Sequence, residues 1–238
     1  MSPSSPRLAL AADLPLPEAQ RVWRAVRGQV GVAKVGLSLF VEHGPAAVRA
    51  FQEDGGRVFL DLKLHDIPNT VELAARRAGE LGVAFLTVHA SGGKGMLEAA
   101  ARGAAEGAAK AGCPAPKLLA VTVLTSMGEA ELASVGHTHS AAELVLRLAQ
   151  LAQQSGIDGL VCSPREVQGL RDRFGSSLFL CTPGIRPAGA ALGDQSRAET
   201  PGYAHRAGSD LLVIGRPIYE AADPAAAAQA ILRELSIS

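Results

Sequence analysis

Residues 57–70 read Arg-Val-Phe-Leu-Asp-Leu-Lys-Leu-His-Asp-Ile-Pro-Asn-Thr, an apolar run that ends in charged residues and leads into a helical pattern. Successive side chains of a β-strand point to opposite faces, so Asp61 and Lys63 share one face. Asp66 falls in the following turn, and Pro68 suits the first turn of a helix. The stretch therefore predicts a strand, a charged turn and a helix, a unit that recurs along the chain.

The charges at the end of this strand need a physical reason. Two acids beside an ammonium are costly to bury unless they compensate one another. The alternative is a solvated strand end with surface ion pairs, which is the usual fate of an Asp-x-Lys triplet. The triplet alone leaves both interpretations open, so the rest of the chain must decide between them.

Short apolar or β-branched runs recur along the chain, separated by stretches rich in Ala, Leu, Glu and Arg. The predicted strands are Leu8–Asp13, Val30–Gly36, Arg57–Lys63, Ala84–His89, Lys117–Leu124, Gly159–Ser163, Ser177–Thr182 and Leu211–Gly215. The predicted helices are Pro45–Asp54, Thr70–Leu81, Met96–Ala111, Ala141–Ser155, Pro164–Phe174, Thr200–Ala207 and, after an Asp223 cap, Pro224 to about Leu235. Near-continuous apolar strands that alternate with helices predict a parallel sheet covered by helices.

Chain length helps to choose between the two α/β architectures that fit this pattern. Eight strand–helix units in 238 residues fit a single (β/α)8 TIM barrel better than an open doubly wound sheet. Periodicity alone does not show that a sheet closes, so the open sheet remains an alternative. No linker or change of composition divides the chain, and we expect one domain over residues 1–238.

Composition and charge narrow the class of protein. The 23 Lys and Arg residues balance the 23 Asp and Glu residues, which gives no bulk attraction to nucleic acid or anionic membranes. No apolar run approaches the roughly 18 residues that span a bilayer, and the N-terminus does not read as a secretory signal. The three cysteines are widely spaced without a Cys-x-x-Cys pair, so we expect reduced thiols in a cytoplasmic protein.

Polar residues end nearly every predicted strand, among them Asp13, Lys34 and His89. In a barrel the carboxyl ends of the strands converge on one face, where catalytic groups sit. The charged set Lys34, Asp61, Lys63 and Asp66 is therefore expected to form one site. A preorganised ammonium beside carboxylates suits proton delivery to a carbanion or stabilisation of developing negative charge.

A second candidate site follows the last two predicted strands. It reads Thr182-Pro183-Gly184-Ile-Arg186-Pro, then Gly193-Asp-Gln195-Ser-Arg197, then Ile214-Gly215-Arg216-Pro. The loops after strands seven and eight commonly bind phosphate in such barrels, and an arginine fork matches a phosphate. Ordinary turn chemistry is the alternative, because Gly and Pro mark turns everywhere. Two glycine turns with suitable donors in these loops favour a phosphate site.

Two further motifs are weaker. Residues 92–95, Gly-Gly-Lys-Gly, lack the spacing of the known phosphate-binding loops and predict a turn. His137 and His139 could suggest a metal, but no acid or cysteine stands at a useful spacing, which favours a solvated loop. No metal site is predicted from the sequence.

These residues together resemble orotidine 5′-phosphate decarboxylase over essentially the whole chain. The segments that carry the resemblance are Lys34–Phe40, Phe59–Thr70, Thr87–Ala90, Ala120–Ser126, Thr182–Pro187, Asp194–Arg197 and Val213–Ile218. The Asp-x-Lys-x-x-Asp-Ile-Pro-Asn-Thr stretch is the most specific of them. One small departure is Ala11-Ala12-Asp13, where the family more often reads Ala-Leu-Asp.

The resemblance implies a decarboxylation of orotidine 5′-phosphate to uridine 5′-phosphate, the last step of de novo pyrimidine biosynthesis, without cofactor or metal. It implies that Lys63 donates the proton to C6 and that Asp61 lies beside the departing carboxylate, with Lys34 and Asp66 completing the network. It implies a homodimer in which Asp66 and Thr70 enter the neighbouring subunit's site. The substrate contacts that it implies are Asp13, Lys34, Asp61, Thr70, Thr125, Ser126, Pro183, Arg186, Gln195, Gly215 and Arg216.

Two other functions remain as alternatives. Ketogulonate-phosphate decarboxylase and hexulose-phosphate synthase share an Asp-x-Lys-x-x-Asp core but use Mg²⁺, and Gly commonly follows soon after their second aspartate. Here Ile67-Pro68-Asn69-Thr70 follows instead, which disfavours them. A non-catalytic phosphate-binding barrel is expected to lose members of the charged set, whereas all four are present.

Overall fold

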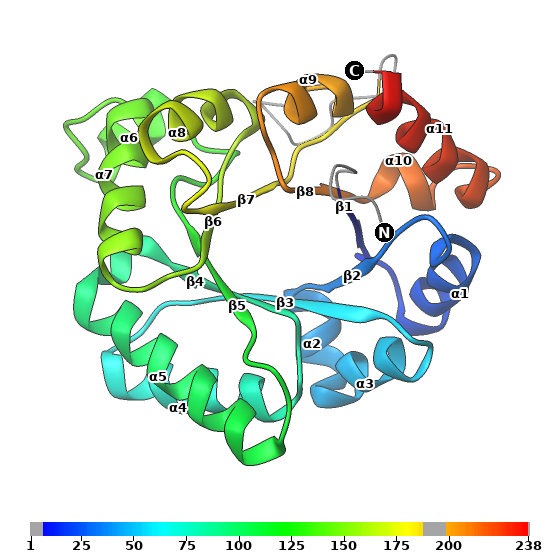
Figure 1. Cartoon of the computed structure of the whole chain (residues 1–238), viewed down its shortest axis with the longest axis horizontal. Coiled ribbons are helices and arrows are strands. Elements are labelled where there is room, and N and C mark those ends of the chain that lie inside the picture. The colour runs from blue at the N-terminus through cyan, green and yellow to red at the C-terminus, as the bar shows by residue number, and fades with distance from the viewer. Residues whose placement is uncertain (1–6, 188–198, 238) are drawn as a thin grey trace.

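The computed structural model describes residues 7–187 and 199–237. The strands are β1 (Arg7–Ala11), β2 (Val32–Val35), β3 (Arg57–Leu64), β4 (Phe85–His89), β5 (Lys117–Val121), β6 (Gly159–Val161), β7 (Phe179–Thr182) and β8 (Leu211–Ile214). They form a closed barrel in chain order, and parallel pairing of β1 with β8 completes the ring (Figure 1). The predicted (β/α)8 barrel is confirmed, and the open sheet is wrong.

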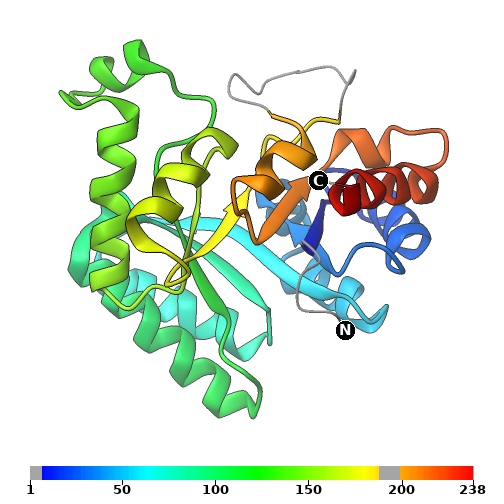
Figure 2. The ribbon, with the colours of Figure 1, turned by 45° about the horizontal axis from the view of Figure 1, so that its top comes forward.

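Helices surround the strands. The α-helices are α1 (Leu16–Val26), α2 (Leu37–His43), α3 (Pro45–Glu53), α4 (Pro68–Glu80), α5 (Gly93–Ala111), α6 (Glu129–Ser134), α7 (Ala141–Gln154), α8 (Val167–Phe174), α9 (Pro201–Arg206), α10 (Arg216–Tyr219) and α11 (Pro224–Ile237). Two short 3-10 helices are η1 (Ala90–Gly92) and η2 (Pro164–Glu166). The last helix, α11, packs beside α1, and the two helices lie on the same side of the barrel (Figure 2).

Several predicted boundaries differ from the structure. The sequence interpretation contained no helix at α1, α2, α6 or α10. In α1 the buried residues Ala19, Val22, Trp23 and Val26 do follow helical spacing. Residues 92–95, predicted as a turn, instead complete η1 and begin α5. The predicted Asp223 cap is confirmed, because Asp223 Oδ1 accepts a hydrogen bond of 3.0 Å from the Ala226 amide.

The core has two layers because the strands alternate their side chains. On β1, Leu8 and Leu10 belong to the large cluster between strands and helices. Ala9 and Ala11 belong to a second cluster, which also contains Phe59, Phe85, Cys181 and Val213 and fills the inside of the barrel. This inner cluster is the floor on which the candidate site rests.

Polar residues follow the inner cluster at the carboxyl ends of the strands. Two positions beyond Val32 the same face of β2 carries Lys34, and two positions beyond Phe59 the same face of β3 carries Asp61. The period of two that places an apolar side chain in the floor therefore places a charged one above it.

Within residues 7–187 and 199–237, none of the helices has both the length and the apolar character that crossing a membrane requires.

Candidate active site at the carboxyl ends of the strands

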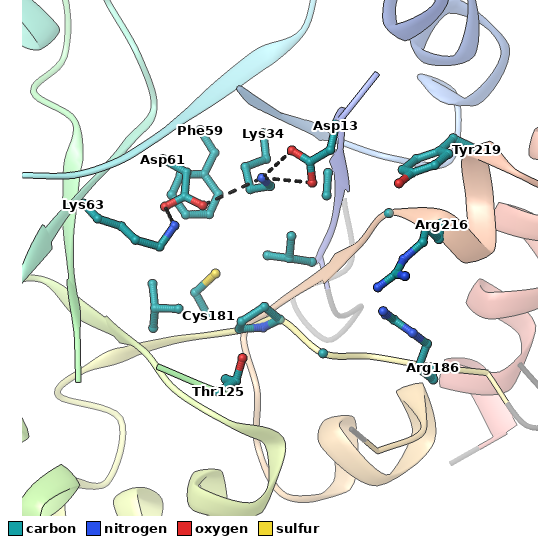
Figure 3. A pocket seen from close by; sticks show the side chains of 16 residues that line it. Asp13, Lys34, Phe59, Asp61, Lys63, Thr125, Cys181, Arg186, Arg216 and Tyr219 are labelled. Carbon is teal, nitrogen blue, oxygen red and sulfur yellow. Dashed lines mark hydrogen bonds and ion pairs between the residues drawn. The ribbon is translucent and has the colours of Figure 1, made fainter. Parts of the chain in front are cut away.

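A cavity of about 270 Å³ opens at the carboxyl ends of the barrel strands (Figure 3). Its apolar walls come from strands β1, β3, β6, β7 and β8. Its lining residues are Ala11, Asp13, Lys34, Phe59, Asp61, Lys63, Thr125, Val161, Cys181, Pro183, Gly184, Arg186, Val213, Gly215, Arg216 and Tyr219. The structure thus brings three members of the charged set, Lys34 on β2 with Asp61 and Lys63 on β3, into one space with the late glycine and arginine turns.

One side of the cavity carries a chain of alternating charges. The Lys34 Nζ atom lies 3.1 Å from Asp13 Oδ1 and 3.8 Å from Asp61 Oδ2. The Lys63 Nζ atom donates a hydrogen bond of 2.8 Å to Asp61 Oδ1. Asp13, Lys34, Asp61 and Lys63 therefore form a continuous line in which each charge faces its opposite; we name these four residues the charge chain. Its centre, Lys34 and Asp61, is the most enclosed part.

The environment holds Asp61 in its charged form. Burial opposes ionisation, but the charges of Lys34 and Lys63 and hydrogen bonds from Lys63 and Thr87 outweigh it together, so the pKa of Asp61 lies below its ordinary value. A carboxylate with this environment is ionised at neutral pH. It can therefore hold the Lys63 ammonium in place at the cavity wall.

A glycine makes room for the outer part of the charge chain. Gly36 lies between β2 and α2, and a Cβ atom built there would lie 3.0 Å from both Asp13 Oδ1 and Lys34 Nζ. Any side chain would therefore press on the Asp13–Lys34 ion pair. The bare backbone at this turn leaves room for the ion pair.

A bulge in β3 sets the direction of Lys63. The β3–β4 register runs from Leu60 opposite Leu86 to Leu64 opposite Val88, so three β3 residues face Thr87 alone. Lys63 has φ of 50°, a left-handed conformation that residues other than glycine rarely adopt. The strand was predicted to end at Lys63 as a regular strand; it instead bulges and continues to Leu64.

The opposite side of the cavity carries two arginines. Arg186 follows β7 and Arg216 begins α10, and their guanidinium groups point toward each other at this side of the cavity (Figure 3). Burial lowers the pKa of Arg186, and the positive charge of Arg216 lowers it further. Two cations that share a cavity would both gain from a bound anion, and their planar forks suit a phosphate.

Gly215 brings the backbone close to its neighbours at this side of the cavity. A Cβ atom built on Gly215 would lie 3.2 Å from the Ala11 Cβ atom and 3.3 Å from Tyr219 Cε1. A side chain here would push the start of α10 away from β1. The glycine therefore keeps Arg216 and Tyr219 at the cavity wall.

Three of the predicted site residues that the structure describes are not among those that line the cavity. Ser126, Asp66 and Thr70 are exposed, and Asp66 Oδ1 accepts a hydrogen bond of 2.7 Å from the Ile67 amide. Gln195 lies outside the described residues. Asp66 was expected to complete the charge network; within the described part of this single chain it makes no ion pair with Lys34 or Lys63 and does not line the cavity.

Sequence reasoning missed several cavity residues. The half-buried Tyr219 lines the cavity beside Arg216, and burial followed by the negative charge of Asp13 raises its pKa. It lies three positions after Arg216 in α10, a helix of four residues, which is too short to show a helical period in the sequence. Phe59, Cys181 and Val213 form the cavity floor, and the period of two along their strands identifies them.

Two histidines lie side by side near Lys63. The His65 and His89 rings are 5.3 Å apart between centroids. Burial lowers the pKa of His89, and the nearby His65 and Lys63 lower it further. His89 is not among the residues that line the cavity. In the part of the chain that the structure describes, no three His, Cys, Asp or Glu side chains gather as a metal site.

The fold and the cavity define a class of protein, a (β/α)8-barrel enzyme whose active site lies at the carboxyl ends of the strands. The chain belongs to the Orotidine 5'-phosphate decarboxylase / HUMPS family, whose model matches residues 6–231.

Relatives with curated names agree with this family. The orotidine 5'-phosphate decarboxylase of Anaeromyxobacter sp. (strain K) is 53% identical over 232 residues, which cover 97% of this chain and 98% of the relative. The orotidine 5'-phosphate decarboxylase of Moorella thermoacetica is 49% identical over 233 residues, covering 97% and 92%.

Solved structures of the same enzyme share the fold. The crystal structure of orotidine 5'-phosphate decarboxylase from Lactobacillus acidophilus has a TM-score of 0.85 and 39% identity, with 97% of this chain and 99% of that chain covered. The enzyme from Pyrococcus horikoshii OT3 has a TM-score of 0.75 and 25% identity, with coverage of 96% and 99%. The similarity therefore extends over the whole barrel.

Proposed function

We propose that this protein is a carboxy-lyase that converts orotidine 5′-phosphate to uridine 5′-phosphate and carbon dioxide, the last step of de novo pyrimidine biosynthesis. The observation that carries the proposal is the Lys63 ammonium, held 2.8 Å from Asp61 at the wall of a cavity whose other side carries Arg186 and Arg216. A proton donor and an anion grip at two sides of one cavity match a phosphorylated substrate that must be protonated after it loses a group.

The proposed chemistry uses Lys63 and Asp61. The bond between C6 and the carboxylate breaks, its electron pair stays on C6, and carbon dioxide leaves. The Lys63 ammonium donates its proton to C6, and the resulting amine takes a proton back from water. Asp61 would lie beside the departing carboxylate, where repulsion between two negative charges favours the loss of that carboxylate as neutral carbon dioxide.

The remaining residues bind the substrate in this proposal. Lys34 Nζ and Asp13 Oδ1 lie 3.1 Å apart, and both residues would contact the ribose hydroxyls. Pro183, Gly215 and the two arginines Arg186 and Arg216 would bind the phosphate. Thr125 lines the cavity and, with Ser126, would contact the pyrimidine. Gln195, outside the described residues, was predicted to donate its amide to the phosphate.

Binding energy from the phosphate would act at the reacting carbon. The grip holds a part of the substrate that does not react, so its energy can be used to position C6 against Lys63 and to desolvate the carboxylate. This explains in physical terms why one cavity would carry two separate sets of charges.

We propose that the active enzyme is a homodimer in which Asp66 and Thr70 serve the neighbouring subunit's site. Both residues are exposed on the single chain. Large apolar side chains stand exposed around them and on α2: Ile67 is 66% exposed and Val41 is 83% exposed, with Leu37 and Leu73 also exposed. These elements follow the paired strands β2 and β3, and an apolar surface of this kind is typical of an interface.

Mixed dimers test this arrangement directly. Lys63→Ala and Asp66→Ala are each expected to be inactive alone. In a mixed dimer, one site combines an intact Lys63 with the Asp66 of the partner subunit, so random mixing should restore about a quarter of the parental activity. If Asp66 instead served its own subunit, both sites of the mixed dimer would be defective and no activity would return.

The magnesium-dependent alternative is less well supported. The family's description names HUMPS beside orotidine 5′-phosphate decarboxylase. Membership of the family alone therefore does not choose between the nucleotide decarboxylase and the alternative. The relatives at 49–53% identity carry the name orotidine 5'-phosphate decarboxylase, and Lys34 and Lys63 already neutralise the Asp61 carboxylate, a group that would otherwise suit a metal.

We also propose that the chain is one catalytic domain and that it works in the cytoplasm without a cofactor.

The experiment that tests the function follows the absorbance of orotidine 5′-phosphate with protein freed of metal by chelation. We expect loss of the substrate signal and formation of equal amounts of uridine 5′-phosphate and carbon dioxide. Ketogulonate phosphate and hexulose phosphate with added Mg²⁺ serve as the comparison substrates. Turnover of those sugars, and none of the nucleotide, would overturn the proposal.

A further inference from the structure

A buried hydroxyl lies directly beneath the reactive pair. Thr87 stands in the middle of β4, between Phe85 and His89 on the inner face, and is completely buried. Two residues earlier the same face carries Phe85, a member of the apolar floor. A polar side chain at such a position must find hydrogen-bond partners to offset its burial.

Both partners of Thr87 belong to the reactive part of β3. The Lys63 amide donates a hydrogen bond of 2.8 Å to Thr87 Oγ1. Thr87 Oγ1 in turn donates a hydrogen bond of 3.0 Å to Asp61 Oδ1, the same oxygen that accepts from Lys63 Nζ. One hydroxyl therefore contacts the backbone of Lys63 and the carboxylate of Asp61 at once.

These contacts fall where the regular ladder is interrupted. Three β3 residues, Asp61 to Lys63, stand opposite Thr87 alone, so the Lys63 amide meets a side chain where a regular strand would offer a backbone carbonyl. Lys63 adopts the left-handed conformation at this point. This conformation is strained in a residue that has a Cβ atom. It persists only where surrounding contacts hold the backbone in it.

We propose that Thr87 is a positioning residue for the reaction: its hydroxyl holds the β3 bulge so that the Lys63 ammonium and the Asp61 carboxylate stay together at the cavity. The inference rests on the proposed function, because it assigns Thr87 a role through Lys63. Without the hydroxyl, the Lys63 amide loses its acceptor and Asp61 loses one donor. The bulge can then relax and the ammonium can move from its place.

The test compares Thr87→Val with Thr87→Ser. Valine keeps the branched shape and removes the hydroxyl, whereas serine keeps the hydroxyl. For Thr87→Val we expect kcat to fall roughly 10- to 100-fold, the scale of a catalytic group displaced by about 1 Å. For the same variant, KM for orotidine 5′-phosphate and Kd for uridine 5′-phosphate should stay within about threefold of the parental values, because the arginine side of the cavity is intact. Thr87→Ser should recover most of the parental kcat.

Thr122→Val is the matched control. Thr122 is also a buried threonine, immediately after β5, and its Oγ1 atom donates a hydrogen bond of 3.2 Å to the carbonyl of Val161, which is not a member of the charge chain. It should show a similar change in melting temperature with parental kcat. The proposal fails if Thr87→Val keeps parental kcat, if its loss is matched by Thr122→Val, or if Thr87→Ser is as defective as Thr87→Val.

A crystal structure of Thr87→Val separates this inference from the proposed function. The expected result is a Lys63 that has left the left-handed conformation and a wider distance between Lys63 Nζ and Asp61. An unchanged β3 bulge in the Thr87→Val structure would overturn the positioning role, even if the parent protein decarboxylates orotidine 5′-phosphate. A parent protein that does not turn over orotidine 5′-phosphate would overturn the proposed function, while the altered bulge would still establish what Thr87 holds.

Discussion

The two sides of the cavity differ in how their charges are arranged. In the charge chain, cations and anions alternate, with Lys34 between Asp13 and Asp61 and Lys63 against Asp61. On the arginine side, Arg186 and Arg216 bring like charges toward each other, and burial and the neighbouring cation both lower the pKa of Arg186. In the first set each charge lies against its opposite, whereas in the second a bound anion would offset the repulsion between the two cations.

This difference separates positioning from binding. Groups that act on the transition state work best when they are already in place, because no reorganisation is then needed during the reaction. Groups that bind a remote part of the substrate need only hold it in place. Two neighbouring cations suit this task, because the repulsion between them favours binding of an anion. The charge chain is therefore the expected reactive side, and the two arginines are the expected grip.

The largest effect is expected at the reactive side. Lys63→Ala removes the proposed proton donor, and general acid catalysis contributes roughly 10²- to 10⁴-fold, so kcat should fall by about 10³-fold or more. Binding of uridine 5′-phosphate, measured by calorimetry, should persist because the grip is untouched. Turnover close to that of the parent would remove Lys63 from the reaction.

A smaller but still large effect is expected at the grip. Hydrogen bonds to charged groups contribute about 1.5–3 kcal/mol each, so losing the Arg216 fork should reduce kcat/KM for orotidine 5′-phosphate by about 10²-fold. Uridine 5′-phosphate should bind correspondingly more weakly in calorimetry. A parental Kd and parental kcat/KM would show that Arg216 does not contact the phosphate.

The smallest effect concerns the pH dependence of stability. The pKa of Asp61 is lowered in the folded protein, so this group stabilises the fold above its ordinary value of 3.8, and that contribution is lost as pH falls from there through the folded pKa. Asp61→Asn should therefore have a lower free energy of unfolding than the parent at pH 6, by denaturant titration.

The difference between the two proteins should shrink as pH falls below 3.8, where the unfolded carboxyl takes up its proton, and level off below the lower folded pKa, where the folded carboxyl is protonated as well. A difference that stays constant across this range would contradict the electrostatic account of Asp61. Arg24→Ala is a suitable control, because its ion pair with Asp54 lies at the surface outside the cavity.

The sequence predicted the strands and most of the cavity because both depend on local periodicity. A period of two placed Asp61 and Lys63 on one face, and the position after the last strands placed Arg186 and Arg216 together. Helix α1 was missed because prolines at positions 15 and 17 obscure its start, and α10 was missed because four residues are too few to show a helical period.

The bulge could not have been predicted in the same way. It depends on the register between β3 and β4, and on a hydroxyl 24 residues away that accepts from the Lys63 amide. Tyr219 was missed for a related reason, since its place at the cavity follows from α10 and from the bare backbone at Gly215. Pairings between distant segments decide these details, and a single sequence does not show them.

The separation of the two sides is tested most directly with orotidine, the same substrate without its phosphate. Its kcat/KM should be measured for the parent, Arg216→Ala and Lys63→Ala. The account predicts that the parent and Arg216→Ala turn over orotidine equally slowly and that Lys63→Ala does not turn it over. If Arg216→Ala reduced turnover of orotidine as strongly as turnover of the nucleotide, the arginine would act on the reaction itself and the proposed division of the cavity would be wrong.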